Sequence, residues 1–179
     1  MKSTDKVLFL FLCATFLLPL SGMSQEQPVS DSLEMRIKSV AQEMMNEAKT
    51  CALISLDTEG RPRIRTMSPF RPEEGFVVWF GTNSHSRKVE QIRQDPRVTL
   101  YYTEKGETGY VMIHGKAELV NDPDEKQKHW KEEWEAFYPN RGEAYLLIKV
   151  SPEWMEVISE KHGILGNEKS WTPHIIRFD

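Results

Sequence analysis

The sequence predicts an α+β fold in which a small antiparallel β-barrel carries a few peripheral helices. After residue 48, most of the chain consists of short apolar or alternating runs separated by turn residues, and few segments have helical spacing. The length of 179 residues, with 39% hydrophobic and 28% charged residues, suits one compact domain. We divide the chain into a leader at 1–24, a linker and helix at 25–48, a barrel domain at 49–160 and a tail at 161–179.

The first 24 residues have the pattern of a secretory signal peptide. Lys2 and Lys6 precede an apolar run over 7–20, and small residues follow it. This run is shorter than the ~20 residues that span a bilayer comfortably. We therefore expect cleavage near Ser24 and export, with the periplasm as destination, and no stable membrane anchor.

Removal of this leader would change the composition of the chain in two ways. Cys51 would be the only cysteine left, so the domain could form no internal disulfide. The whole chain has a net charge of −4. The leader carries two lysines and one aspartate, so the mature chain would have a charge of −5, which argues against nucleic acid as a partner.

The first helix is expected from Ser30 or Asp31 to about Ala48. Apolar residues recur there at the three- and four-residue spacing of an amphipathic helix. They are Leu33, Ile37, Val40, Met44 and Met45.

A β-hairpin is expected next, with strands at 51–56 and 61–68 and a turn at 57–60. Side chains alternate along a strand, so Arg61, Arg63 and Arg65 share one face of the second strand. Two readings of this face are open. It is either a solvated edge whose charges discourage aggregation or a site for anions.

The rest of the barrel should contain five more strands and two helices. The strands are expected at 76–80, 98–102, 110–120, 144–150 and 154–159. The helices are expected at 86–94 and from 122 or 124 to 137. In the second helix Trp130, Trp134 and Phe137 would lie on one face and pack it onto the barrel.

The stretch from Gly81 to Lys88 has the composition of an anion site. It combines hydroxyl residues with Arg87 and Lys88 where a strand should end and a helix begin. Free amide groups and the positive end of the helix dipole favour a phosphate at such a place. The residues alone do not say which phosphate.

Other kinds of site have little support in the sequence. The five histidines are scattered and lack the spacing of a zinc site, so we expect no metal. No serine lies in a nucleophile elbow, and neither a Walker loop nor a dinucleotide fingerprint is present. No residue can be named as a catalytic acid, base or nucleophile.

Four short motifs give the chain a resemblance to a known family. They are Pro62-Arg63-Ile64-Arg65-Thr66-Met67, then Thr82-Asn83-x-x-Ser86-Arg87-Lys88 with Gln91-Ile92, then Asp95-Pro96-Arg97-Val98, and Gly115-Lys116-Ala117-Glu118. Their order and spacing resemble the pyridoxamine 5′-phosphate oxidase-like family, in particular its short, general stress protein 26-like branch, over about 49–159. The resemblance implies an FMN-binding split β-barrel, mainly antiparallel and Greek-key-like. It also implies a homodimer with flavin at the subunit interface.

The resemblance assigns a phosphate-binding role to four residues. Arg65 and Lys88 would bind the phosphate of FMN, and Ser86 and Arg87 would assist. A dianionic phosphate is well served by two cations with hydroxyl and backbone donors. By this resemblance, the cofactor is expected to be FMN.

The same resemblance places the flavin ring beside the second strand of the hairpin. Thr66, Met67 and Ser68 would contact the ring through their main chain, and Gly81 and Thr82 would line the same site. A neutral ring system needs a strand edge and apolar cover, which this arrangement would supply.

Three departures from the family pattern argue against pyridoxamine phosphate as the substrate. Phe70 stands where the oxidase has a lysine for the substrate phosphate, and Tyr110 stands where it has a glutamine that contacts flavin. The C-terminal arginine motif of the oxidase is not recognisable. Tyr110 could cover or hydrogen-bond the flavin, or be an ordinary strand tyrosine.

The expected function is therefore an exported, FMN-dependent oxidoreductase whose small-molecule substrate or redox partner is unknown. NAD(P)H is not expected outside the cytoplasm, so an enzyme that uses another electron donor is favoured over a nicotinamide-driven reductase. Two alternatives remain open. One is a non-enzymatic barrel that binds flavin or haem, with His114 or His162 as an axial ligand, and the other is a barrel that has lost ligand binding.

Overall fold

The structure is a computed structural model that describes residues 29–106, 109–138 and 140–178. In this described part, seven strands form one antiparallel sheet in the order β2-β1-β4-β5-β6-β3, with β7 paired to β6. The strands are β1 (Cys51–Leu56), β2 (Pro62–Met67), β3 (Val78–Asn83), β4 (Arg97–Thr103), β5 (Tyr110–Val120), β6 (Tyr145–Ile158) and β7 (Ile175–Arg177). The helices are α1 (Asp31–Glu47), α2 (Arg87–Gln94), α3 (Pro123–Lys128) and α4 (Arg141–Ala144), with 3-10 turns η1 (Glu74–Phe76) and η2 (Glu132–Trp134).

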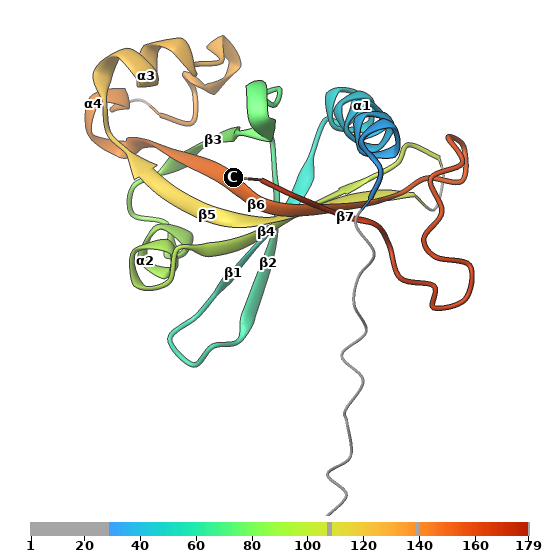
Figure 1. The fold of residues 1–179 in the computed structure, drawn as a ribbon. Coiled ribbons are helices and arrows are strands. Elements are labelled where there is room, and N and C mark those ends of the chain that lie inside the picture. The colour runs from blue at the N-terminus through green and yellow to red at the C-terminus, as the bar shows by residue number, and fades with distance from the viewer. Residues whose placement is uncertain (1–28, 107–108, 139, 179) are drawn as a thin grey trace, which may run out of the picture.

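The sheet curls into a half-barrel, which confirms the predicted fold class (Figure 1). Its longest pairing, between β5 and β6, shifts register between His114 and Gly115. A Cβ at Gly115 would fall within 3.0 Å of the Ser151 carbonyl oxygen, so this close approach requires glycine. Such a bulge bends a strand and increases its twist, and here it helps the sheet to curl.

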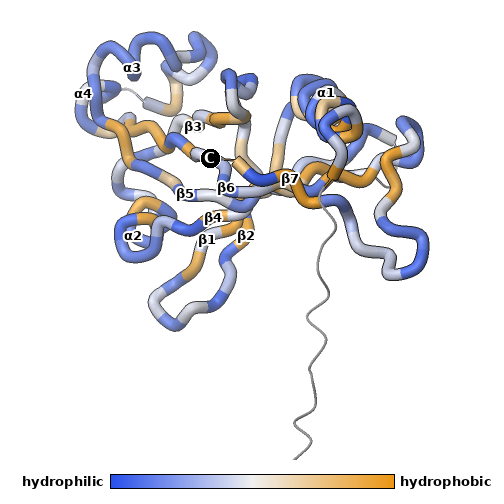
Figure 2. The backbone as a smooth tube through the Cα atoms, in the orientation of Figure 1, coloured by the Kyte–Doolittle hydropathy of each residue, from blue (hydrophilic) through white to orange (hydrophobic). Residues whose placement is uncertain are grey.

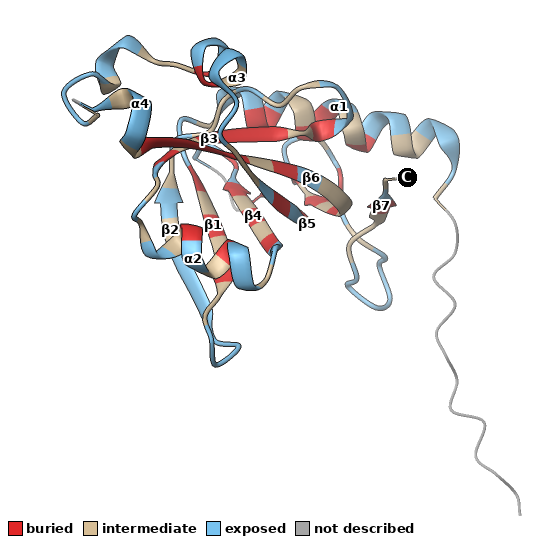
Figure 3. Ribbon diagram, turned by 90° about the vertical axis from the view of Figure 1, so that its left-hand side faces the viewer, coloured by how far each residue is buried: buried red, intermediate tan, exposed pale blue. Residues whose placement is uncertain are grey.

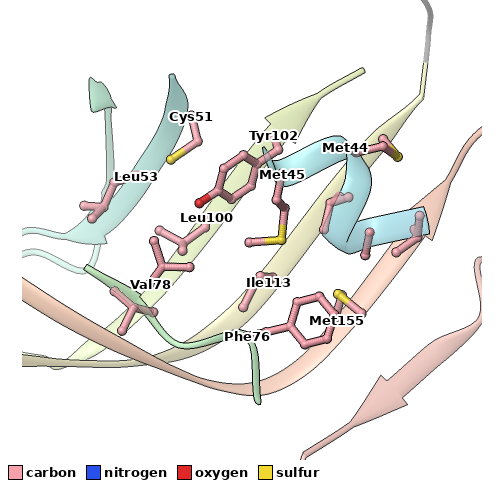
Figure 4. Close-up of a cluster of buried hydrophobic side chains, with 14 of the residues drawn as sticks. Met44, Met45, Cys51, Leu53, Phe76, Val78, Leu100, Tyr102, Ile113 and Met155 are labelled. Carbon is pink, nitrogen blue, oxygen red and sulfur yellow. The ribbon is translucent and has the colours of Figure 1, made fainter. Parts of the chain in front are cut away.

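The main core lies between the curled sheet and α1. Met44 and Met45 of α1 are buried against strand residues such as Leu100 and Ile113 (Figure 4). The predicted stripe is confirmed, because Ile37, Val40, Met44 and Met45 are buried and Leu33 packs against the same cluster. Ile92 of α2 joins this cluster as well. Figure 2 shows hydrophobic residues concentrated on the strands and hydrophilic ones on the connecting loops.

A second, aromatic cluster covers the other side of β3 and β6. We call the segment 121–144, which contains α3, η2 and α4, the flap. Its Trp130, Trp134 and Tyr138 pack with Trp79 of β3 and Tyr145 of β6. Figure 3 shows β3 and the first half of β6 as the most continuously buried stretches of strand, because they have packing on both faces.

The helix predicted from 122 or 124 to 137 is wrong. Asp122 caps α3 and Pro123 begins it, but α3 ends at Lys128. His129 leaves the helical conformation and stacks on Trp79 with ring centroids 4.3 Å apart. Burial of the aromatic rings thus interrupts the helix. Phe137, expected on the packing face, is 75% exposed.

Two strand predictions also need correction. The strand expected at 76–80 begins at Val78 and continues to Asn83, because Phe76 lies in η1 with a positive φ. The strands expected at 144–150 and 154–159 are one strand, β6. Pro152 does not break β6 because it lies opposite Gly115 at the bulge, where the ladder is already irregular.

The structure describes most of the C-terminal tail but not the predicted leader. The predicted leader, 1–24, lies outside the described residues. The tail at 161–179 adds the short strand β7, and its Ile176 is buried in the main core. No helix in the described ranges is long and apolar enough to cross a membrane.

Candidate functional site

A cavity of about 300 Å³ lies between the end of β2 and the start of α2. Its lining residues are Arg65, Thr66, Met67, Ser86, Arg87 and Lys88. The structure therefore brings together six of the ten residues predicted to bind the cofactor. The volume is at the lower end of the range for small-molecule sites.

A tight turn after β3 presents α2 to this cavity. The side chain of Asn83 accepts a hydrogen bond from the His85 amide at 2.9 Å, and its carbonyl accepts one from the Ser86 amide at 3.0 Å. Helix α2 then begins at Arg87. Its first-turn amides and the positive end of its dipole accordingly lie at the cavity.

The hydroxyl groups at this turn form a small network. Ser86 is the N-cap residue of α2, but its side chain does not cap the helix. Its hydroxyl lies 3.2 Å from Oγ1 of Thr82 instead, and Lys88 Nζ donates to the same Thr82 oxygen at 3.1 Å. Thr82 is buried, so this network fixes the ammonium of Lys88 at the wall of the cavity.

Arg65 is held by two uncharged residues. Its NH1 donates to Ser55 Oγ and its NH2 to Gln91 Oε1, each at 2.8 Å. Burial lowers the pKa of Arg65, and Arg87 and Arg63 lower it further. Burial likewise lowers the pKa of Lys88, with Arg65 as the second cause. The cations of the site thus lie close enough for one to lower the pKa of another.

The cations of the cavity differ from the other arginines of the hairpin in their ionic contacts. Among the described residues, no carboxylate forms an ion pair with Arg65, Arg87 or Lys88. In contrast, Arg61 and Arg63 both contact Asp57, at 3.1 and 3.0 Å. The arginines of the hairpin therefore have different surroundings. Arg61 and Arg63 are paired with Asp57 at the exposed hairpin tip, as on a solvated edge, whereas Arg65 lines the cavity, where an anion could bind.

The other predicted site residues lie outside the cavity lining. Ser68 follows β2, and its hydroxyl accepts a hydrogen bond from Lys131 of the flap at 2.9 Å. Gly81 lies within β3 and faces the flap, because a Cβ there would come within 3.0 Å of the rings of Trp134 and Tyr145. For Ser68 and Gly81, as for Thr82, contact with a cofactor stays a prediction.

Tyr110 lies at the start of β5, away from this cavity. Its ring stacks on Tyr101 with centroids 5.2 Å apart, and its hydroxyl donates to Glu156 at 3.0 Å. Burial and then Glu156 raise the pKa of Tyr110 to about 12. It is thus a neutral tyrosine with a hydrogen-bond partner, and a role in covering flavin stays a prediction.

The two histidines considered as haem ligands differ in their contacts. His114 Nδ1 lies 2.9 Å from Thr99 Oγ1, and its ring stacks on Trp154. His162 Nε2 is buried and has no hydrogen-bond partner among the described residues, and carboxylate oxygens of Glu43 and Glu104 lie 3.6 and 3.7 Å away. The described residues contain no group of three or more histidines, cysteines or acids placed to hold a metal ion.

Sequence reasoning missed the two residues that hold Arg65. Gln91 was part of a family motif without a role of its own, and Ser55 was counted as a strand residue. A signal for Ser55 exists, since it is a polar residue at an inward-facing position of an apolar strand and is 1% exposed. Its partner could not be found without the fold, because Gln91 lies 36 residues away.

The curled antiparallel half-barrel, with a cationic cavity between β2 and α2, has the architecture of a split-barrel protein. The sequence matches the pyridoxamine 5′-phosphate oxidase-like family over residues 37–167, and the chain belongs to this family. It is 26% identical over 121 residues to general stress protein 26 of Bacillus subtilis, covering 65% of this chain and 84% of that protein.

Solved structures of similar proteins support the same fold. General stress protein 26 of Bacillus anthracis is 23% identical with a TM-score of 0.61, covering 82% of this chain and 98% of that one. A protein of Clostridium acetobutylicum related to general stress protein 26 is 18% identical with a TM-score of 0.65, covering 80% and 95%. The predicted family and split-barrel fold are thereby confirmed.

Proposed function

We propose that this protein binds FMN and uses it as a redox cofactor, as an oxidoreductase for a small-molecule substrate other than pyridoxamine phosphate. The observation that carries the proposal is the cavity between β2 and α2. It gathers three cations without any acidic partner among the described residues. Such a group of charges is stable only if solvent or an anion compensates it.

The residues of the cavity fit a phosphate group. Arg65 keeps donors free beyond the two that contact Ser55 and Gln91, since a guanidinium has five. Lys88 is fixed by Thr82, and the amides at the start of α2 add neutral donors. Hydrogen bonds between charged groups contribute about 1.5–3 kcal/mol each, so Arg65 and Lys88 would dominate phosphate affinity.

The protein would bind and orient the cofactor rather than supply acid or base groups. None of the described residues that line the cavity is a carboxylate, imidazole or thiol. Bound flavin supplies hydride and electron transfer by its own chemistry. Thr66 and Met67 continue from Arg65 along β2 and would keep the ring beside this strand.

Flavin titration tests this proposal. We expect the purified protein to bind FMN, with a shifted visible spectrum and altered flavin fluorescence, and to bind riboflavin much more weakly because riboflavin lacks the phosphate. Arg65→Ala should weaken FMN binding about 10- to 150-fold and riboflavin binding little. The absence of any FMN binding, or equal binding of FMN and riboflavin, would contradict the proposal.

We also propose that the protein is exported and that residues 1–24 are removed. The support is the lysine-flanked apolar run followed by small residues. Fractionation of cells followed by N-terminal sequencing of the purified protein tests this. A protein that stays in the cytoplasm with its first 24 residues intact would contradict it.

A homodimer is the third part of the proposal. Family resemblance implies it, and Ile64 of β2, a large apolar side chain that is 70% exposed, is accessible to a second copy. Light scattering should give twice the chain mass, and Ile64→Glu should shift it toward the monomer. A wild-type protein that is monomeric at all concentrations would rule out the dimer.

A further inference from the structure

Three side chains form a closed triangle of hydrogen bonds at the back of the cavity. Ser55 Oγ donates to Gln91 Oε1, while Arg65 donates to both of these oxygens, and all three distances are 2.8 Å. The three residues come from β1, β2 and α2. The triangle therefore joins the hairpin to the helix that carries Lys88.

We propose that Ser55 and Gln91 are positioning residues that aim the guanidinium of Arg65 at the bound phosphate without neutralising its charge. This inference rests on the proposed function only in that the cavity takes a phosphate group. Neither residue lines the cavity itself. Both act through Arg65, and neither is expected to touch the ligand.

The strand register shows how the triangle directs Arg65. Arg65 lies opposite Leu53, whereas Ser55 is two residues further along β1 on the same face. The Arg65 side chain must therefore lean diagonally along the sheet, toward α2, to reach its partners. Its NH1 and NH2 each use one N–H on the triangle, so the other N–H groups remain for an anion.

The two groups that accept hydrogen bonds from Arg65, the Ser55 hydroxyl and the Gln91 amide oxygen, are both uncharged. A partly buried arginine is commonly compensated by a carboxylate. Here the acceptors are a hydroxyl, which is 1% exposed, and an amide oxygen, so the full positive charge stays available. A glutamate at position 91 could accept the same hydrogen bonds, but its charge would compete with the phosphate.

The triangle also sets the distance between the two principal cations. Gln91 follows Lys88 by three residues on α2, so it lies about one turn away on the same helix. Its contact with Arg65 connects the middle of α2 to β2. Arg65 and Lys88, which come from different elements, are thereby held on one cavity.

The test compares FMN and riboflavin binding in Gln91→Glu with the wild-type protein. We expect FMN affinity to fall at least about tenfold, because a carboxylate would pair with Arg65, and riboflavin affinity to stay within about twofold. Gln94→Glu is the matched control, since Gln94 lies on the same helix, is exposed and carries the same change of charge. It should change both affinities by less than about twofold.

A pH profile separates positioning from a general structural effect. Relative to wild type, FMN affinity of Gln91→Glu should recover as the pH falls and the new carboxyl group becomes protonated. If Gln91→Glu does not fold, Gln91→Met and Ser55→Ala replace it, and each should lower FMN affinity several-fold more than riboflavin affinity. Equal losses for the two ligands, or unchanged FMN binding, would overturn the inference.

Inorganic phosphate distinguishes failure of this inference from failure of the proposed function. If the wild-type protein binds no flavin, phosphate should still raise its melting temperature, and Gln91→Glu should abolish this increase. That result would reject FMN and support the positioning role. If phosphate gives the same increase in Gln91→Glu, Gln94→Glu and wild type, the positioning role is rejected.

Discussion

Replacement of Lys88 by methionine should separate ligand affinity from protein stability. Methionine keeps most of the apolar stem and removes the ammonium that contacts Thr82 at 3.1 Å. A charge-assisted hydrogen bond to phosphate is worth about 1.5–3 kcal/mol, so FMN affinity should fall about 10- to 150-fold. The loss should be small for riboflavin.

Stability of the ligand-free protein should change much less. The substitution removes one charge-assisted hydrogen bond, from the Lys88 ammonium to the Thr82 hydroxyl, and such a bond contributes about 1.5–3 kcal/mol. Thr82 keeps Ser86 as a partner. In the opposite direction, burial and Arg65 lower the pKa of Lys88 below that of an ordinary lysine, so its charge destabilises the folded state at neutral pH.

These two effects oppose each other, and the net change should stay within about 1 kcal/mol, or about 2–4 °C in melting temperature. The sign of the second effect can be checked with pH. A lowered lysine pKa means that the unfolded chain binds its proton more tightly, so the destabilising contribution is complete below the folded pKa and disappears above 10.5. The stability that Lys88→Met gains by removing this charge should therefore shrink as the pH rises from the folded-state pKa to 10.5.

FMN titration and urea unfolding at neutral pH measure the two quantities. Arg93→Met is the matched control, because Arg93 lies on the same helix, is exposed and loses the same charge. A loss of more than about 2 kcal/mol in stability with unchanged FMN affinity would make Lys88 a structural anchor. An equal loss of affinity in Arg93→Met would show that only the net charge matters.

Two further predictions concern packing and reactivity. Gly81→Ala should lower the melting temperature and alter tryptophan fluorescence, because its Cβ would collide with the ring of Trp134 at a cost of about 1–3 kcal/mol. Gly142→Ala, where nothing lies within 4 Å, should be neutral or slightly stabilising. Burial raises the pKa of Cys51 from 9.0 to about 12, so in a Cys13→Ser background a thiol reagent should label Cys51 only after unfolding. Rapid labelling of Cys51 in the folded protein would contradict its burial. The raised pKa also means that Cys51 lowers the free energy of unfolding as the pH rises from about 9 toward 12, because only the unfolded chain ionises this thiol readily.

Elements with a strong local signal could be predicted from the sequence. The apolar stripe of α1 and the hairpin of β1 and β2 depend on spacing and on a turn within a few residues. The segment 122–137 was predicted wrongly because Trp130 and Trp134 have helical spacing, while their actual packing is with Trp79 and Tyr145. That packing depends on strands far away in the chain, and no local pattern contains it.

The candidate site divides in a similar way. The cluster at the start of α2 was visible because hydroxyl and cationic residues are concentrated there. Arg65 entered only through the resemblance to a family, since three arginines alternate along that strand and their periodicity alone does not distinguish them. Ser55 stands out as a polar residue at an inward-facing position of an apolar strand, but nothing in the sequence shows that it and Gln91 contact Arg65.

The three arginines of the hairpin, Arg61, Arg63 and Arg65, differ in the charge of their partners. Asp57 at the hairpin tip compensates Arg61 and Arg63, while Arg65 receives a hydroxyl and an amide. If Arg65 served only to stabilise the fold, an acid at position 55 or 91 would satisfy the same donors and remove the repulsion from Arg87. The neutral partners leave that repulsion in place, so the protein keeps an unfavourable charge distribution that a bound phosphate would relieve.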